Sequence, residues 1–189
     1  MASKRTSGKR ASAAPVTVSR RELLIGESDE AFRHFIHGLL AFGERMLAVR
    51  AGFGELIGLS GIQYTVLVSI AHLQTRHTVS VGAVAAHLHL SGAFITTVTN
   101  QLVSAGFIRK SRAPGDRRVA VLVTTPKAQQ SLDQLAPMQR QVNDQLFAPL
   151  TRAHFEELSR SMDSWIESGD RAVALLDYLK HGPVAKTGS

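Results

Sequence analysis

The chain has 189 residues, of which 44% are hydrophobic and 20% are charged, and its formal net charge is +7. It has no apolar run near the roughly 18 residues that a membrane span requires and no secretory signal, so we expect a cytoplasmic protein without a membrane partner. The absence of cysteine excludes disulfides, thiolate metal sites and thiol redox switches.

Residues 1–27 are expected to form a disordered basic tail. The first 21 residues contain six basic residues and no acidic residue, and they show no periodic apolar pattern. Such a segment cannot bury enough apolar surface to offset the entropy lost on ordering. Contact with DNA and simple solvation of a charged surface are both open for this tail.

Residues 28–58 are predicted to form a long amphipathic helix. Ser28 is a good N-cap, acidic residues follow in the first turn, and apolar residues recur at helical spacing to about Val49. The next helix is predicted to start at the capping box Ser60-Gly-Ile-Gln63.

Two short helices separated by a tight turn are predicted next, with Ser80 and Ser91 as their N-caps. In the second of them Ile95, Val98 and Leu102 share one face and should pack inward. The outward face suits a DNA major groove, because Asn or Gln can bond adenine and a Thr methyl can contact the thymine methyl. The alternative is an ordinary polar helix face. The residues expected to contact DNA here are Ser91, Ala93, Thr96, Thr97, Asn100 and Gln101.

A β-hairpin is predicted after Gly106. Phe107–Ser111 and Arg118–Thr124 are the expected strands, and Arg112–Arg117 is the expected turn. Thr125 and the proline after it then open another helix. Two short helices followed by a basic hairpin are typical of a winged helix-turn-helix that binds DNA.

The charge distribution agrees with this interpretation. Residues 59–126, the expected DNA-binding region, contain six basic residues against Asp116 alone, whereas the flanking regions are mildly acidic. Basic surface gathered on one module is the electrostatic pattern expected for phosphate contact.

Residues 127–181 are predicted to form two long helices with apolar stripes. Pro149 and the cap Thr151 separate the two helices, and Pro137 predicts a kink within the first. Together with residues 28–58 they carry more apolar surface than the DNA-binding region can cover, so we expect dimerisation helices. Residues 182–189 are expected to form a flexible tail. The expected fold class is mainly α with a small β-hairpin wing, a winged helix-turn-helix plus N- and C-terminal dimerisation helices.

The stretch from Leu59 to about Ala128 resembles the MarR family of winged helix-turn-helix transcription regulators. The most specific motif is Asp116-Arg-Arg118, which a Val-rich strand and Thr124-Thr-Pro follow. The other matching segments are Leu59–Leu67, Val84–Ser91, Thr96–Leu102 and Gly106–Arg109.

The resemblance implies a homodimer whose first and last two helices interlock while two winged helices straddle a palindromic DNA site. It also implies that Arg118 enters the minor groove, that Asp116 helps to hold the wing, and that Arg117 meets the phosphate backbone. Arg112, in the same turn, completes the expected DNA contacts. Position 97 is often basic in the family and is Thr here, so we expect a preference for A·T-rich half-sites.

Many members of the family release DNA when they bind small aromatic acids or related anions, which implies a repressor with such an effector. Arg33 and His37 lie four residues apart and can hold a carboxylate or phosphate, with Tyr64 and Trp165 as walls. An aromatic acid and an acyl-coenzyme A both suit these groups. The simpler alternative for Arg33 and His37 is a solvated helix face.

Other functions have less support in the sequence. The pairs His34/His37 and His87/His89 lack a third ligand, so no metal or other cofactor is expected. No phosphate-binding Gly-rich loop, His-Glu-x-x-His helix or Gly-x-Ser-x-Gly elbow occurs, so we expect no enzyme activity. The main alternative is an architectural DNA-binding protein of weak sequence preference. A clear sequence preference in the bound DNA would indicate the regulator, and its absence would indicate the architectural protein.

Overall fold

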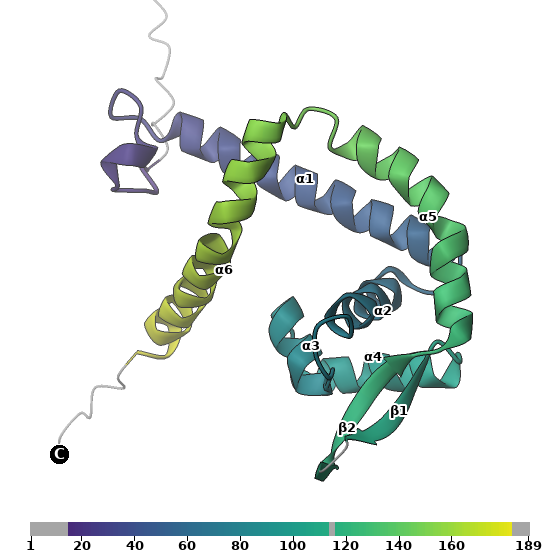
Figure 1. Ribbon diagram of the computed structural model, residues 1–189. Helices are drawn as coiled ribbons and strands as arrows, with labels where there is room; N and C mark the ends of the chain where they lie inside the picture. Colours follow the sequence, from purple (N-terminus) through teal and green to yellow (C-terminus); the bar gives the residue numbers. More distant parts are fainter. Residues whose placement is uncertain (1–14, 114–115, 183–189) are drawn as a thin grey trace, which may run out of the picture. The chain divides into compact units, whose positions relative to one another are not determined.

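The computed structural model describes residues 15–113 and 116–182, and it is mainly helical with one two-stranded antiparallel sheet (Figure 1). The chain divides into two compact units, one ending at Gln139 and one beginning at Arg140, and each is described by itself. The elements are α1 Glu30–Glu55, α2 Gly61–Leu73, α3 Val81–Leu88, α4 Gly92–Ser104, β1 Ile108–Ala113, β2 Asp116–Thr124, α5 Pro126–Leu146 and α6 Arg152–His181.

Residues 15–29 form an ordered arm before α1, with a 3-10 helix at Arg21–Leu23 and a β-bridge between Ile25 and Ser28. This corrects the expectation of disorder for residues 15–27, while residues 1–14 of the expected tail lie outside the described residues. The arm is held because Oδ2 of Asp29 accepts hydrogen bonds from the backbone N, at 2.7 Å, and the hydroxyl, at 2.8 Å, of Thr17.

The first helix lies within the predicted range of residues 28–58. Asp29, not Ser28, is the N-cap of α1, and the helix ends at Glu55. The end of α1 lies close to the loop before α2 and to the first residue of α2, since a Cβ atom on Gly54 would lie 2.7 Å from the carbonyl oxygen of Leu59. A Cβ atom on Gly61 would lie 3.0 Å from Cα of Ala51. Glycine is therefore required where these two helices meet.

Helices α2, α3 and α4 pack around the main apolar core. The predicted caps are confirmed, because the hydroxyls of Ser60, Ser80 and Ser91 each accept a hydrogen bond from the backbone N–H three residues later. The complete capping box predicted at the start of α2 is present as well. The largest fully buried apolar side chains of this core are Val66, Leu67, Ile70, Val79, Val84, Ile95, Leu102, Ile108 and Leu122.

The predicted hairpin is confirmed, with longer strands than expected. Ile108 pairs with Thr124 and Arg112 pairs with Ala120, and the register shifts next to Ala113. The outer side of β2 is also bonded, because the backbone N of Leu122 donates to the carbonyl of Val79 at 2.8 Å. The segment before α3 thus runs along β2 and fixes the base of the hairpin against the core.

Side chains reinforce both ends of the hairpin base. The amide of Gln74, at the end of α2, bonds both the hydroxyl and the backbone N of Thr124. Thr125 donates its hydroxyl proton to the carbonyl of Gly106 at 2.7 Å and caps α5 through the backbone N of Ala128. Thr125 is therefore the predicted N-cap, and it also ties the start of the hairpin to its end.

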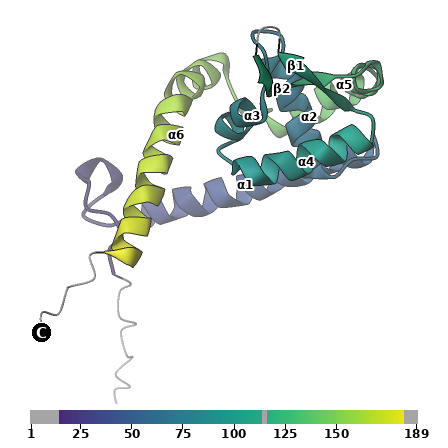
Figure 2. The ribbon, with the colours of Figure 1, turned by 90° about the horizontal axis from the view of Figure 1, so that it is seen from below.

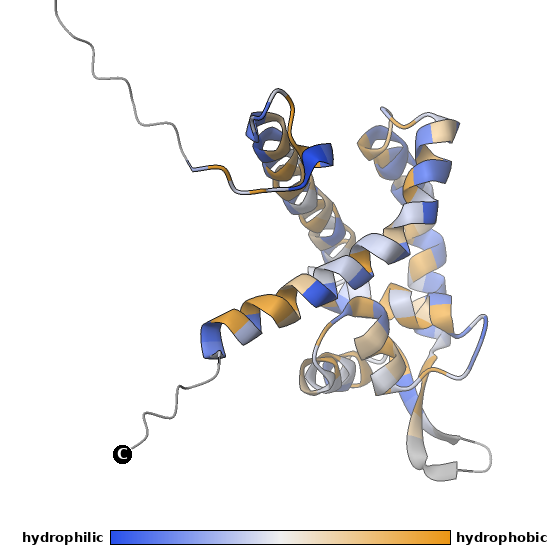
Figure 3. Ribbon diagram, turned by 90° about the vertical axis from the view of Figure 1, so that its left-hand side faces the viewer, coloured by the Kyte–Doolittle hydropathy of each residue, from blue (hydrophilic) through white to orange (hydrophobic). Residues whose placement is uncertain are grey.

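In the second unit, α6 is a 30-residue helix with the predicted cap, because Thr151 accepts a hydrogen bond from the backbone N of His154. Orange bands along α6 in Figure 3 mark its apolar residues. Among the described residues no single helix is long and apolar enough to span a membrane, and only the bent pair α3 and α4 meets that length and composition together. The inward side chains of this pair belong to the core described above.

Candidate DNA-binding surface

Helix α4 presents one face to the core and the other to the outside. Ile95, Val98 and Leu102 are buried as predicted. Figure 2, which views the protein from below, shows α4 along its full length on that side of the first unit. All six residues expected to contact DNA on this helix are exposed, namely Ser91, Ala93, Thr96, Thr97, Asn100 and Gln101.

The two threonine hydroxyls on this exposed face are bonded within α4. The hydroxyl of Thr96 donates to the carbonyl of Gly92 at 2.8 Å, and the hydroxyl of Thr97 donates to the carbonyl of Ala93 at 3.2 Å. Each threonine thus satisfies its hydroxyl on the preceding turn of its own helix.

The two amides on α4 bond neighbouring elements. Oδ1 of Asn100 accepts a hydrogen bond from Nζ of Lys110 on β1 at 2.7 Å. Oε1 of Gln101 accepts from Nε2 of Gln63 at 3.0 Å, and Gln63 also completes the capping box of α2. Sequence reasoning missed Lys110 and Gln63, because these partners lie 10 and 38 residues away and no local pattern pairs them.

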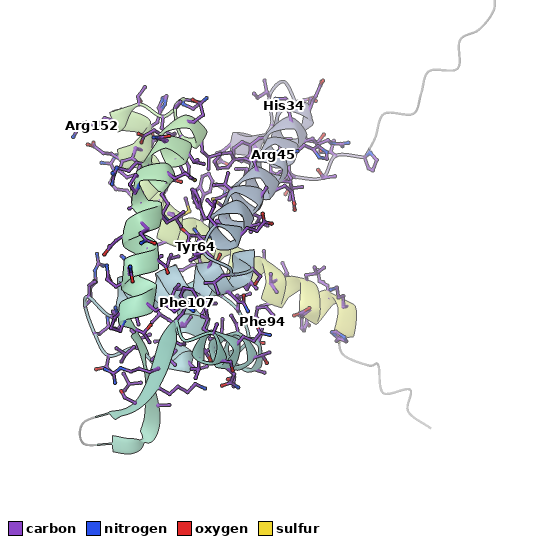
Figure 4. All side chains as sticks on the ribbon, turned by 90° about the vertical axis from the view of Figure 1, so that its right-hand side faces the viewer. His34, Arg45, Tyr64, Phe94, Phe107 and Arg152 are labelled. Carbon is purple, nitrogen blue, oxygen red and sulfur yellow. The ribbon has the colours of Figure 1, made fainter. Side chains whose placement is uncertain are left out.

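A large apolar side chain, Phe94, also lies on the exposed part of α4 and was missed. It lies in the first turn, its backbone N donates to the cap Ser91, and it is 44% exposed (Figure 4). A signal was present in the sequence, since Phe94 falls outside the buried stripe of Ile95, Val98 and Leu102. An apolar ring on a DNA-facing helix can contact a thymine methyl group.

Basic residues lie on the hairpin next to this helix. Arg109 and Lys110 on β1 are exposed. The backbones of Arg112, Asp116, Arg117 and Arg118 lie in β1 and β2, and their side chains lie outside the described part of the structure.

Lys127 has a different environment from Lys110. Its Nζ donates to the carbonyl of Ala105 at 2.8 Å and lies 4.5 Å from the ring centroid of Phe107. The positive charge therefore sits at the C-terminal end of α4, where it is favourable to the helix dipole. Lys127 stabilises the helix end, whereas Lys110 extends from the strand beside the exposed face.

The residues proposed for an effector do not form one cluster in the first unit. Arg33 is engaged by the arm, where its guanidinium pairs with Asp29 at 3.0 Å and donates to the carbonyl of Pro15. Tyr64 instead lies beside Arg50. Arg50 is 17 residues further along α1 than Arg33, which corresponds to about 25 Å at a helical rise of 1.5 Å per residue. His37 is exposed on α1, and Trp165 is exposed on α6 in the second unit.

Tyr64 is the buried aromatic group among these residues (Figure 4). Its ring lies 5.8 Å from the ring of Phe53, the guanidinium of Arg50 lies 5.3 Å from its centroid, and its hydroxyl accepts a hydrogen bond from Gln139. Burial raises the pKa of the phenol above 10.0, although Gln139 and Arg50 act in the opposite direction. Tyr64 is therefore a neutral phenol at physiological pH, with a cation above its ring.

One of the histidines considered in the sequence, His87 on α3, lies against a histidine of α2. The ring of His87 stacks on that of His72, with centroids 6.1 Å apart. Across residues 15–113 and 116–182, no three side chains of ligating type are grouped so that they could hold a metal ion.

Comparison with known proteins agrees with this geometry. Residues 57–119, which run from the end of α1 into the wing, match the MarR family model. No curated protein matches the chain.

Several solved structures have the same fold. The transcriptional regulator BldR from Sulfolobus solfataricus is 18% identical, with a TM-score of 0.59 over 72% of this chain and 95% of its own. AbsC, a MarR family transcriptional regulator from Streptomyces coelicolor, is 16% identical, with a TM-score of 0.64 over 74% of this chain and 94% of its own.

A third similar structure is BpsR from Bordetella bronchiseptica, whose DNA binding is regulated by 6-hydroxynicotinic acid. It is 19% identical, with a TM-score of 0.56 over 68% of this chain and 90% of its own. The family match covers α2, α3, α4 and β1 and ends within β2. Residues 57–119 therefore match the model of the MarR family, and the chain shares the fold of these solved structures.

Proposed function

We propose that the protein is a homodimeric, sequence-specific transcription regulator that binds palindromic double-stranded DNA. The observation that carries this proposal is the exposed outer face of α4, whose opposite face is locked into the core, beside the basic strand β1. A helix of this kind enters the major groove while basic residues beside it neutralise phosphates.

Dimerisation is supported by the apolar side chains that α1 and α6 leave exposed. On α1, Leu40 is 63% and Leu47 is 58% exposed, and on α6, Val173 is 61% and Leu179 is 67% exposed. Side chains of this size gain about 1.5–3 kcal/mol each when fully buried, so a second copy that covers them is stabilised. Light scattering on the purified protein tests the dimer, and a monomer at micromolar concentration would contradict it.

We further propose repression that a small anionic effector relieves. The regulation of BpsR by 6-hydroxynicotinic acid supports an aromatic acid, and the group of Tyr64, Arg50 and Gln139 supplies an aromatic wall, a cation and an amide. Arg33 and His37 lie near the start of α1, so they can contact the effector only if it binds at that end of the helix. An acyl-coenzyme A is the second effector class.

The effector proposal is tested by titrating 6-hydroxynicotinic acid into the protein–DNA complex. A site at Tyr64 is supported if the acid releases DNA from the parent protein but releases less from Arg50→Gln. The DNA affinity of Arg50→Gln without the acid should equal that of the parent protein. Release that Arg33→Gln weakens instead would place the anion at the start of α1. No release by the acid would contradict an aromatic acid effector of this kind.

The DNA-binding proposal is tested by selecting bound duplexes from a randomised pool at near-physiological salt. A two-fold symmetric motif with half-site centres about one helical turn, roughly 10 base pairs, apart is the expected result. Tight binding without any enriched motif would contradict the regulator. It would favour the architectural alternative, which the absence of Lys and Arg from α4 also fits.

A further inference from the structure

The exposed face of α4 offers apolar groups to DNA in preference to polar ones. Both threonine hydroxyls are bonded to carbonyls of the same helix, and the amide oxygens of Asn100 and Gln101 are bonded to Lys110 and Gln63. The exposed residues at the start of the helix that carry apolar groups are Phe94, Ala93 and the two threonines.

The engaged amides argue against readout of adenine by Asn100 or Gln101. Bidentate readout requires the amide oxygen to accept from adenine N6 while the amide nitrogen donates to N7. The oxygen of Asn100 faces the ammonium group of Lys110 instead, and this charge-assisted hydrogen bond is stronger than a neutral one. Asn100 is therefore a positioning residue for Lys110.

We propose, on the basis of the function proposed above, that α4 recognises the 5-methyl groups of pyrimidines in the major groove, with Phe94 as its main contact. Thymine carries this methyl group in the major groove, and cytosine and uracil do not. Phe94 lies in the first turn of α4, the part of a recognition helix that reaches base edges. The preference for A·T pairs then comes from methyl contact and not from hydrogen bonds to adenine.

The test compares DNA that contains thymine with the same DNA synthesised with deoxyuridine in its place. The comparison is made with the selected duplex and also with an unselected A·T-rich pool. The pool allows the test even if the selection yields no palindrome. Loss of one buried methyl group corresponds to about a fourfold loss of affinity, so each recognised thymine should contribute a factor near that value. A further pair of duplexes has the recognised T·A pairs changed to C·G pairs. In these duplexes, 5-methylcytosine in place of cytosine should restore part of the affinity.

Two variants of Phe94 test whether the difference in affinity between thymine and deoxyuridine DNA arises at the first turn of α4. Phe94→Ala should bring the affinities for thymine and deoxyuridine DNA close together, whereas Phe94→Leu should keep part of the difference. Val103→Ala is the matched control, because Val103 is exposed to a similar degree, 38%, but lies in the last turn of α4. The control should keep the full difference.

The outcomes separate this inference from the function it rests on. An enriched palindrome whose affinity is unchanged by deoxyuridine overturns methyl recognition and leaves the regulator intact. A thymine preference without an enriched palindrome supports methyl recognition and contradicts the dimeric regulator. Sensitivity to 7-deazaadenine that Asn100→Ala abolishes, with no effect of deoxyuridine, would show that the amide reads adenine.

Discussion

The ammonium nitrogen of Lys110 lies 2.7 Å from Oδ1 of Asn100, so one hydrogen bond joins strand β1 to helix α4. The bond holds a long, exposed side chain beside the outer face of α4. A lysine held in this way loses less side-chain entropy when it meets a phosphate than a freely rotating one does. The hairpin and α4 are thus linked through a polar contact as well as through the core.

We expect Lys110→Ala to reduce the salt dependence of DNA binding. Removing one phosphate contact lowers the slope of log K against log salt by about 0.9. Lys127→Ala is the control, because Lys127 is equally charged but bonded to the carbonyl at the end of α4. Affinities measured at four or more salt concentrations give the slopes. Equal slopes for the two variants would place Lys110 outside the DNA interface.

Arg118→Ala should weaken DNA binding while the dimer remains intact. The expected loss is about 1–3 kcal/mol, the range for an arginine that contacts bases. Arg76→Ala, on the exposed segment between α2 and α3, removes the same charge and should have a smaller effect. Fluorescence anisotropy on the selected duplex measures both affinities. If Arg118→Ala and Arg76→Ala bind equally well, the wing has no base-reading role.

Two glycines of α1 should respond to alanine in opposite ways. Gly54→Ala places a Cβ atom 2.7 Å from the carbonyl oxygen of Leu59, so overpacking should destabilise the fold by about 1–3 kcal/mol. Gly52→Ala meets nothing within 4 Å and should stabilise the helix by about 0.5–1 kcal/mol. Urea denaturation measures both free energies of unfolding. A Gly54→Ala variant as stable as the parent protein would mean that α1 does not lie this close to the loop before α2.

The arm before α1 should be released at low pH. The hydrogen bonds from Arg33 and then Thr17 lower the pKa of Asp29 from 3.8 to about 2. Because the folded pKa is the lower one, the contact is complete above 3.8 and is lost as the pH falls toward 2. Asp29→Asn should release the arm at neutral pH, and Glu30→Gln, one residue later, should not.

Hydrogen exchange at the backbone N of Thr17 reports on this release, because that group donates to the Asp29 carboxylate. Fast exchange in Asp29→Asn and slow exchange in Glu30→Gln are expected. Equal protection in both variants would show that the carboxylate does not hold the arm.

The parts of the fold that the sequence predicted depend on contacts within one or two turns. The caps at Ser80 and Ser91 and the buried stripe of α4 are set by neighbours three or four residues away, so their pattern is visible in the sequence. The hairpin was predicted for the same reason, although its strands extend closer to the turn than expected.

The parts that were missed depend on contacts between distant residues. The order of the arm comes from a hydrogen bond across 12 residues, and the partner of Gln101 lies 38 residues away. Arg33 was expected to meet an anion near Tyr64, yet the arm supplies its partners and Tyr64 lies near the other end of α1. Residue type gave the chemistry of these groups, and only the fold gave their neighbours.

The base of the hairpin also bears on how the protein avoids unwanted association. A free strand edge offers unpaired N–H and C=O groups on which a strand of another molecule can add. Here the outer side of β2 is closed by the carbonyl of Val79 and the amide of Gln74, and β1 carries the charges of Arg109 and Lys110. The hairpin proposed to contact DNA thus has few free backbone groups on the outer side of β2 to which a strand of another molecule can bond.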